Sequence, residues 1–282
     1  MYTDHKELLA DESVDAVVVA LPTYHHERIG IDTMRSGRPV LMEKPLARSV
    51  AAARRMIDVS RKTGQLLMAA HCRRFDPDWG AMARQVQQDR LGRPILWRSI
   101  SAGPGRGSWF IDEKLGGGPL FDQAVHDFDF ANYLFGDPQH VLASAVETHP
   151  DLSAVNCGTA VVRYSTGDQL LVSRATRVGR GAAAFDLVGS KATLTPGTGK
   201  LEPNADSAVY GFWTLTSLAG KQRLVRYRRQ NMLVNQARHF LDCIDRKLAC
   251  RSPAQEAIKA VAVGEAVLKA VRRGGGGRKI QW

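Results

Sequence analysis

Short apolar runs alternate with amphipathic stretches over the first third of the chain. The apolar runs cover residues 14–21, 39–42 and 65–70. The stretches with a helical pattern cover residues 25–36, 49–62 and 76–89. Such short apolar runs are typical of strands buried on both faces of a sheet, and Gly37 and Gly64 are typical helix stops. The alternation predicts a doubly wound, parallel α/β sheet over residues 1–92.

The pattern changes near residue 93, where polar and apolar positions begin to alternate in runs that follow one another directly. The predicted strands cover residues 95–102, 140–148, 159–164, 169–176, 183–188, 192–195, 221–229 and 279–282. The predicted helices cover residues 120–134, 231–246 and 253–271. This pattern favours a large, open, mostly antiparallel sheet with one face left to solvent or a partner. Residues 93–282 are therefore expected to form a second, α+β domain.

Composition and charge narrow the class of protein. A chain of 282 residues suits two domains, and 44% hydrophobic with 24% charged residues excludes a disordered chain. The net charge of +11 is scattered along the sequence. Residues 221–229 (KQRLVRYRR) are the best candidate for a basic nucleic-acid-binding strand. An anionic cofactor or substrate accounts for the excess of positive charge equally well. We expect no nucleic-acid partner, although this basic strand keeps that alternative open.

The sequence shows no pattern typical of a membrane protein or of a disulfide-bonded secreted protein. No apolar run approaches the roughly 20 residues that cross a bilayer, and the N-terminus lacks the apolar core of a signal peptide. The four cysteines are widely and irregularly spaced, which gives no disulfide framework. We expect no membrane association and a location in the reducing cytoplasm.

Lys44 is the first candidate for chemistry. It lies in a Glu-Lys-Pro turn directly after the predicted strand at 39–42. Ligands of open α/β sheets bind at the carboxyl ends of the strands, which is where this turn lies. An ordinary surface lysine in a βα loop is the alternative at this stage.

A second candidate constellation lies at residues 116–126 (GGGPLFDQAVH). Asp122 and His126 are four residues apart, so they share one face of the predicted helix. Polar groups on an otherwise apolar helix need partners or a cleft. The alternative is a satisfied Asp–His pair inside the core. No third ligand, HxxxH or CxxC supports zinc, so we predict no metal.

Together, Lys44, Asp122 and His126 suit proton and hydride chemistry at an alcohol. Histidine can take a hydroxyl proton near neutral pH, and a lysine ammonium stabilises the developing alkoxide. The aspartate can hold a neighbouring substrate hydroxyl or tune the histidine, while a nicotinamide accepts the hydride. Trp109 and Trp213 could stack on a sugar, but packing of loops is an equal alternative.

Four sequence stretches carry a resemblance to a known family. They are residues 14–22 (VDAVVVALP) with His26, 37–45 (GRPVLMEKP), 74–77 (RFDP) and 116–127 (GGGPLFDQAVHD). In this order they resemble the glucose–fructose oxidoreductase/inositol dehydrogenase (Gfo/Idh/MocA) family over nearly the whole chain. The resemblance implies a Rossmann domain ahead of a substrate-binding and oligomerisation domain with an open sheet. It also implies NAD or NADP as cofactor, a sugar or cyclitol substrate, and a homodimer or homotetramer formed through that sheet.

The resemblance also implies roles for individual residues. Lys44 is the catalytic lysine and lies on the nicotinamide side, Asp122 orients the substrate, and His126 is the acid/base. Pro22, His26 and Glu43 lie beside the cofactor.

The chain departs from the family pattern in one respect. No Gly-x-Gly-x-x-Gly turn leads from a strand into a helix; residues 179–184 match the spacing but precede a predicted strand. We expect residues 1–92 to be the C-terminal part of a Rossmann domain, with the start codon further upstream or a natural truncation. The predicted function is an NAD(P)-dependent oxidoreductase of polyols, impaired in this chain if the cofactor-binding segment is missing. A non-catalytic sugar-binding or assembly relative is the alternative.

Overall fold

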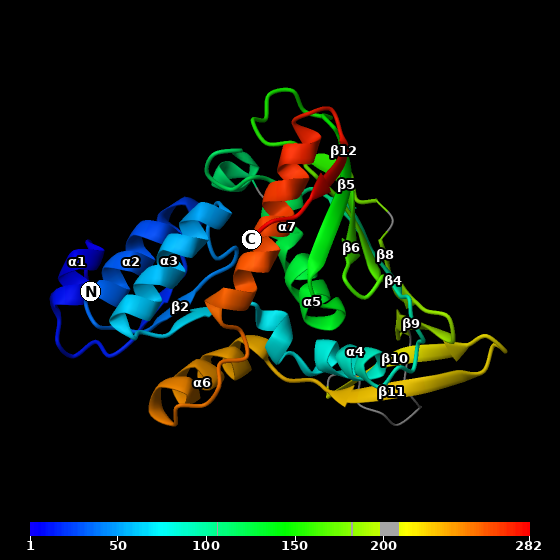
Figure 1. Cartoon of the computed structure of the whole chain (residues 1–282), viewed down its shortest axis with the longest axis horizontal. Helices are drawn as coiled ribbons and strands as arrows, with labels where there is room; N and C mark the ends of the chain where they lie inside the picture. Colours follow the sequence, from blue (N-terminus) through cyan, green and yellow to red (C-terminus); the bar gives the residue numbers. More distant parts are fainter. Residues whose placement is uncertain (106, 182, 198–208) are drawn as a thin grey trace.

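A three-stranded parallel sheet forms the N-terminal part of the described molecule (Figure 1). The computed structural model describes residues 1–105, 107–181, 183–197 and 209–282. The strands, in the order β1-β2-β3, are β1 (Val17–Val19), β2 (Val40–Met42) and β3 (Leu67–Ala69). The helices around them are α1 (His5–Ala10), α2 (His26–Arg35) and α3 (Val50–Thr63). The predicted parallel α/β sheet is confirmed.

The sequence explains these elements locally. All residues of β2 and β3 are buried, which matches their continuous apolar character. The Ser49 side chain caps α3 by accepting from the backbone N–H of Ala52, and Gly64 ends the helix with φ of 71°. The apolar run at 14–21 pairs with β2 over Val17–Val19 only, and the exposed fraction of Val18 is 61%.

The second part of the chain is built on a larger sheet. Among the described residues it has nine strands in the order β11-β10-β9-β8-β4-β7-β6-β5-β12. They are β4 (Leu96–Gly103), β5 (Pro138–Val146), β6 (Cys157–Tyr164), β7 (Gln169–Thr176), β8 (Ala184–Val188), β9 (Ala192–Pro196), β10 (Tyr210–Ser217), β11 (Gln222–Arg228) and β12 (Gly276–Lys279). Their pairings are antiparallel except for β4 with β7, which is parallel. The expected open, mostly antiparallel sheet is confirmed.

The structure differs from the sequence predictions at two strands and agrees with them at one glycine-containing segment. β10 was not predicted, and it pairs with β9 and β11. The last strand is Gly276–Lys279 and not 279–282, because the glycine-rich segment pairs with β5 in the register Gly276↔Ala143. Residues 179–184 lead into β8 and not into a helix, as predicted from their context, although Ala182 lies outside the described residues.

Helix α4 (Pro77–Gln87) packs on the large sheet, although it follows the Rossmann elements in sequence. The Trp213 indole of β10 donates to the backbone oxygen of Asp78 at 3.2 Å, and Arg223 of β11 donates to Gln85 at 2.8 Å. The division of the chain at residue 92 stays a prediction.

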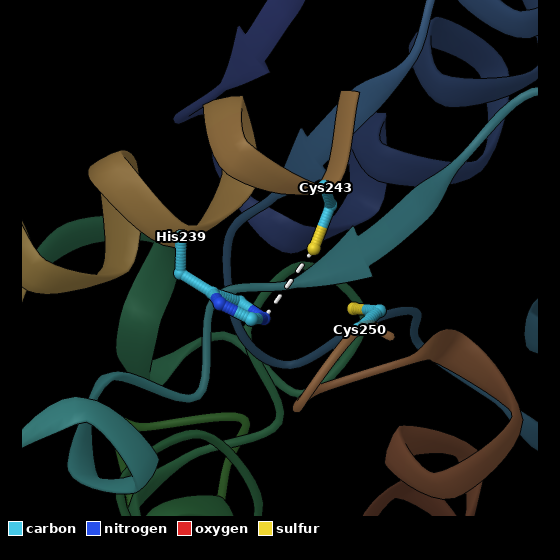
Figure 2. Close-up of side chains that lie close together, drawn as sticks. All are labelled: His239, Cys243 and Cys250. Carbon is cyan, nitrogen blue, oxygen red and sulfur yellow. Dashed lines mark hydrogen bonds between the residues drawn. The ribbon is translucent and has the colours of Figure 1, made fainter. Parts of the chain in front are cut away.

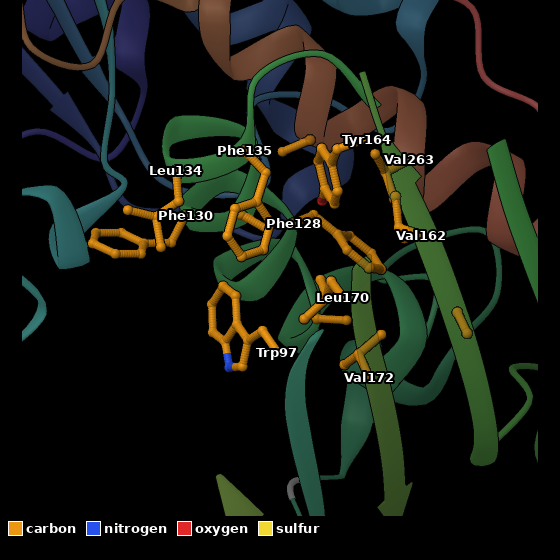
Figure 3. Close-up of a cluster of buried hydrophobic side chains, with 14 of the residues drawn as sticks. Trp97, Phe128, Phe130, Leu134, Phe135, Val162, Tyr164, Leu170, Val172 and Val263 are labelled. Carbon is orange, nitrogen blue, oxygen red and sulfur yellow. The ribbon is translucent and has the colours of Figure 1, made fainter. Parts of the chain in front are cut away.

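Helices α5 (Val125–Phe135) and α7 (Ala254–Val271) lie against one face of the large sheet (Figure 1). Aromatic side chains of α5 meet Trp97 and the inward side chains of β6 and β7 in the main core (Figure 3). Helix α7 contributes to two hydrophobic clusters. Val263 packs in the main core at the large sheet, and Val261 packs in a second cluster with residues of the parallel sheet. The remaining α-helix of the described residues is α6 (Met232–Asp245). None of the helices in the described ranges has the length and apolarity that spanning a membrane requires.

Candidate active site

A cavity of about 740 Å³ lies where the carboxyl ends of β1 and β2 face the second part of the chain. Pro22, Glu43 and Lys44 line it from the loops after these two strands. Asp122 and His126 line it from the opposite side. This is the edge at which open α/β sheets bind ligands. The structure therefore brings the three predicted catalytic residues to one cavity.

Lys44 and Asp122 form a shielded ion pair. The Lys44 Nζ donates to Asp122 Oδ1 at 2.7 Å and to the Asp122 backbone oxygen at 3.2 Å. The exposed fractions of the two side chains are 19% and 6%. Lys44 is thus not an ordinary surface lysine. The pairing holds the ammonium at the cavity wall, where it can act on a bound oxygen.

A π-helical turn places Asp122 ahead of His126. The predicted helix at 120–134 consists of this turn, η4 (Pro119–Gln123), followed by α5. Gly118 enters the turn with φ of 74°, and the backbone N–H of Ala124 donates to the Pro119 oxygen at 3.0 Å. π-Turns of this kind are frequent at functional sites. Asp122 pairs with Lys44 and not with His126, so the alternative of an Asp–His pair is not realised.

Two buried polar atoms of the site have no hydrogen-bond partner among the described residues: Asp122 Oδ2 and His126 Nδ1. Unpartnered buried polar atoms are costly, so these two are candidates to bind a polar ligand. Burial lowers the pKa of His126 well below its usual value, and the positive charges of Arg73 and Lys44 add to the effect. The imidazole is therefore neutral at neutral pH and can accept a proton.

Asp127 anchors the site from beneath. Arg73 donates to Asp127 Oδ1 at 2.8 Å, Arg174 pairs with the other carboxylate oxygen, and Ser99 donates at 3.1 Å. Since Asp127 is fully buried, these bonds tie the start of α5 to β4, β7 and the turn η2 (Cys72–Phe75). Arg73 and Arg174 also line the cavity. Neither arginine was predicted from the sequence as a site residue. Arg73 could have been found from its position next to the RFDP stretch, whereas no sequence pattern pointed to Arg174.

The remaining predicted residues differ in their positions. Pro22 and Glu43 line the cavity, and burial raises the pKa of Glu43. His26 is buried and is not among the lining residues. Its ring nitrogens lie 2.9 Å from the Pro45 oxygen and 2.8 Å from the Leu21 oxygen. His26 therefore braces the two loops that carry Pro22 and Lys44.

The two tryptophans also separate. Trp109 lines the cavity. Trp213 does not, and the suggestion that it could stack on a sugar is wrong. It is buried in the main core and its indole nitrogen lies 2.5 Å from Asp78 Oδ1.

Comparison with protein families identifies the chain. Residues 1–71 match the model described as "Oxidoreductase family, NAD-binding Rossmann fold", and residues 79–195 match the "GFO/IDH/MocA C-terminal domain". The chain belongs to the Gfo/Idh/MocA family of oxidoreductases, as its motifs indicated.

Curated relatives include inositol dehydrogenases. Inositol 2-dehydrogenase 2 of Saccharopolyspora erythraea is 34% identical over 149 residues, which are 52% of this chain and 42% of that protein. Myo-inositol 2-dehydrogenase of Thermotoga maritima is 28% identical over 200 residues, which are 68% of this chain and 59% of that protein. The matches thus span about half the length of these relatives.

A solved structure confirms the architecture. The WlbA dehydrogenase from Bordetella pertussis, in complex with NADH and UDP-GlcNAcA, superposes with a TM-score of 0.78 at 18% identity. The match covers 99% of this chain and 83% of that one. The likeness establishes a shared fold.

Proposed function

We propose that this protein is an NAD(P)-dependent oxidoreductase that transfers a hydride between a sugar or cyclitol hydroxyl and nicotinamide. The observation that carries the proposal is the convergence of Lys44, Asp122 and His126 on one cavity at the carboxyl edge of a parallel sheet. The unpartnered Asp122 Oδ2 and His126 Nδ1 match a ligand rich in hydroxyl groups. The curated inositol dehydrogenases support the same substrate class.

The wall of the cavity formed by the β1 and β2 loops suits the nicotinamide end of the cofactor. Pro22, Glu43 and Lys44 would hold it there, and His26 would keep their loops in place. NAD(P)⁺ supplies the hydride acceptor for the oxidation of an alcohol.

The protein's own residues supply the proton chemistry. His126 is neutral, because burial and nearby positive charge lower its pKa, and it accepts the proton of the reacting hydroxyl. The Lys44 ammonium stabilises the negative charge that develops on that oxygen. Asp122 positions Lys44 through one carboxylate oxygen. Its other carboxylate oxygen can accept a hydrogen bond from a neighbouring hydroxyl of the substrate. The charges of Arg73 and Lys44 then favour the release of the proton from His126.

Activity of the purified protein with a panel of inositols and sugar alcohols and either NAD⁺ or NADP⁺ tests this proposal. We expect dinucleotide reduction with at least one polyol, but only at high dinucleotide concentration, because this sequence has no Gly-x-Gly-x-x-Gly turn to bind the pyrophosphate. His126→Ala should lower kcat by about 10²–10⁴-fold because the base is lost. His140→Ala is the matched control, since His140 is exposed on β5 and lies outside the cavity.

The possible results separate the two candidate functions. A His126→Ala protein with normal turnover would refute the role of His126. Polyol binding by calorimetry without turnover, even at a dinucleotide concentration shown by titration to saturate the protein, would refute the oxidoreductase and support the sugar-binding relative.

We also propose that the protein assembles as a homodimer or homotetramer through the outer face of the large sheet. The helices α5 and α7 cover the other face. On the outer face of β5, Leu142 and Val146 have exposed fractions of 59% and 66%. Uncovered apolar side chains on an extended sheet favour association.

The four free cysteines support a reducing compartment, for which we propose the cytoplasm.

A further inference from the structure

One imidazole and two thiols meet at the end of α6, outside the candidate active site (Figure 2). His239 and Cys243 are four residues apart on α6, so they share one helix face. Cys250 follows the helix in the next loop. The His239 Nε2 lies 3.4 Å from Cys243 Sγ, and the three candidate ligand atoms all lie within 4.8 Å of one another.

The backbone holds Cys250 in this position. After α6, Lys247 adopts φ of 53°, and the chain turns back toward the parallel sheet. The backbone N–H of Ala69 in β3 donates to the Ser252 oxygen at 2.9 Å, and Pro253 forms a bridge with Met68. The loop that carries Cys250 is therefore tied to a buried strand.

The histidine is in the form that binds metals. The backbone N–H of Arg251 donates to His239 Nε2 at 3.1 Å, so this nitrogen carries no proton and its lone pair is free to bind either a donor or a metal. A metal would take the place of the Arg251 N–H on that lone pair.

We propose that His239, Cys243 and Cys250 form a binding site for Zn²⁺ or a similar thiophilic divalent cation. Two thiolates and one imidazole are ligands of tetrahedral zinc. Zinc–sulfur bonds of about 2.3 Å and zinc–nitrogen bonds of about 2.0 Å place such ligands roughly 3.5–4 Å apart. The observed separations need a contraction of about 1 Å or less, which side-chain rotation supplies. The two thiolates also balance the charge of the cation.

The fourth ligand can come from solvent. A second cavity of about 440 Å³, lined by His239 and Asp242 among others, adjoins the cluster. Metal binding requires the thiolate forms of Cys243 and Cys250, so it releases their protons.

The site would add a link to a helix that is packed on one face only. Three apolar side chains of α6, Leu233, Val234 and Leu241, are exposed. On the packed face, Phe240 is buried against β2 and β3, and the ring of His239 lies 5.2 Å from that of Phe75 in the turn η2. A cation shared by His239, Cys243 and Cys250 would link α6 to the loop ahead of α7. The prediction of no metal rested on the lack of a third ligand near Asp122 and His126 and of any HxxxH or CxxC motif. The H-x₃-C-x₆-C spacing of this cluster matches neither motif.

Metal titration of the reduced, chelator-treated protein tests the proposal. We expect the full chain to bind about one equivalent of Zn²⁺ and, with Co²⁺, to develop a thiolate-to-metal charge-transfer band. Loss of an outer group that supports a metal ligand already costs about 10–100-fold in affinity. Cys243→Ser or Cys250→Ser should therefore weaken binding by at least about tenfold and remove the band.

Cys157→Ser is the matched control, because Cys157 lies on β6 outside the cluster, and it should bind as the wild type does. Alkylation of the wild-type protein gives a readout independent of folding defects: Zn²⁺ should protect Cys243 and Cys250 and leave Cys157 reactive. The His126→Ala protein should still bind the metal, which separates this site from the proposed enzymatic function.

Two results would overturn the proposal. One is the absence of Zn²⁺ binding to the reduced wild-type protein. The other is a Cys243–Cys250 disulfide in protein purified without reductant, together with no protection of the reduced thiols by Zn²⁺.

Discussion

Charged residues around the cavity are fixed by partners that are themselves buried. The Asp127 carboxylate forms ion pairs with Arg73 and Arg174 and accepts a hydrogen bond from Ser99. The Asp129 carboxylate accepts two hydrogen bonds from Arg74, at 2.9 Å and 2.6 Å. Removing one partner of such a pair leaves a buried charge uncompensated, which is strongly destabilising. The network therefore gives Lys44, Asp122 and His126 a rigid support.

His71 lies in the same region and makes stability depend on pH. It is buried, both ring nitrogens lack a hydrogen-bond partner among the described residues, and burial lowers its pKa to about 4. As the pH falls from 6.5 toward 4, the unfolded chain gains this proton and the folded chain does not. The free energy of unfolding should therefore fall by up to about 3 kcal/mol from this group, at 1.36 kcal/mol per pH unit.

Urea unfolding of His71→Gln at several pH values measures this effect. The variant should lose less stability between pH 6.5 and pH 4 than the wild type, because it has no ring to protonate. His140→Gln is the control, because His140 is exposed. Its free energy of unfolding should change with pH as that of the wild type does. Parallel curves for wild type and His71→Gln would contradict the assignment.

The glycine turn before α5 shows how one element sets the geometry of the site. A Cβ at Gly116 would lie 2.6 Å from the Trp109 oxygen and 2.7 Å from the Phe110 oxygen. Both are backbone atoms, which cannot rotate away. The turn thus requires glycine here, and it leads directly into the segment that carries Asp122 and His126.

Gly116→Ala should consequently lower the free energy of unfolding by about 1–3 kcal/mol, as overpacking does. Turnover should also decrease, because the turn that positions Asp122 has to shift. Gly103→Ala is the control, since a Cβ there meets no atom within 4 Å. Chemical denaturation together with the polyol assay measures both effects, and an unchanged Gly116→Ala protein would show that the turn adapts freely.

In the whole molecule, α5 and α7 lie against one face of the large sheet, and Leu142 and Val146 of β5 are exposed on the other. Light scattering at micromolar concentration should show a dimer or tetramer. Leu142→Arg, which places a charge on the exposed face of β5, should shift the protein toward the monomer. Arg is well tolerated on an exposed strand face, so near-UV circular dichroism should be unchanged. A compact wild-type monomer would contradict assembly through this sheet.

Much of the fold could be predicted because short-range patterns determine it. Apolar runs gave β2 and β3, glycine stops ended the helices, and alternation located β4, β6 and β7. β10 was missed although its partner β11 follows it directly along the chain. The glycine-rich β12 was misplaced because its partner, β5, lies far away in sequence. At the site, the family motifs placed five of the predicted residues on the cavity wall, while His26 lies behind it.

Local hydrophobic periods, turn residues and motif spacing are enough to predict most of the elements, the family and the residues that carry the proposed chemistry. They do not predict which charges meet. Lys44 and Asp122 are 78 positions apart, and Arg174 and Asp127 are 47 apart. Such pairs, like Cys250 beside His239, depend on how sheets and helices pack, because no local pattern specifies which distant side chain will share a buried space.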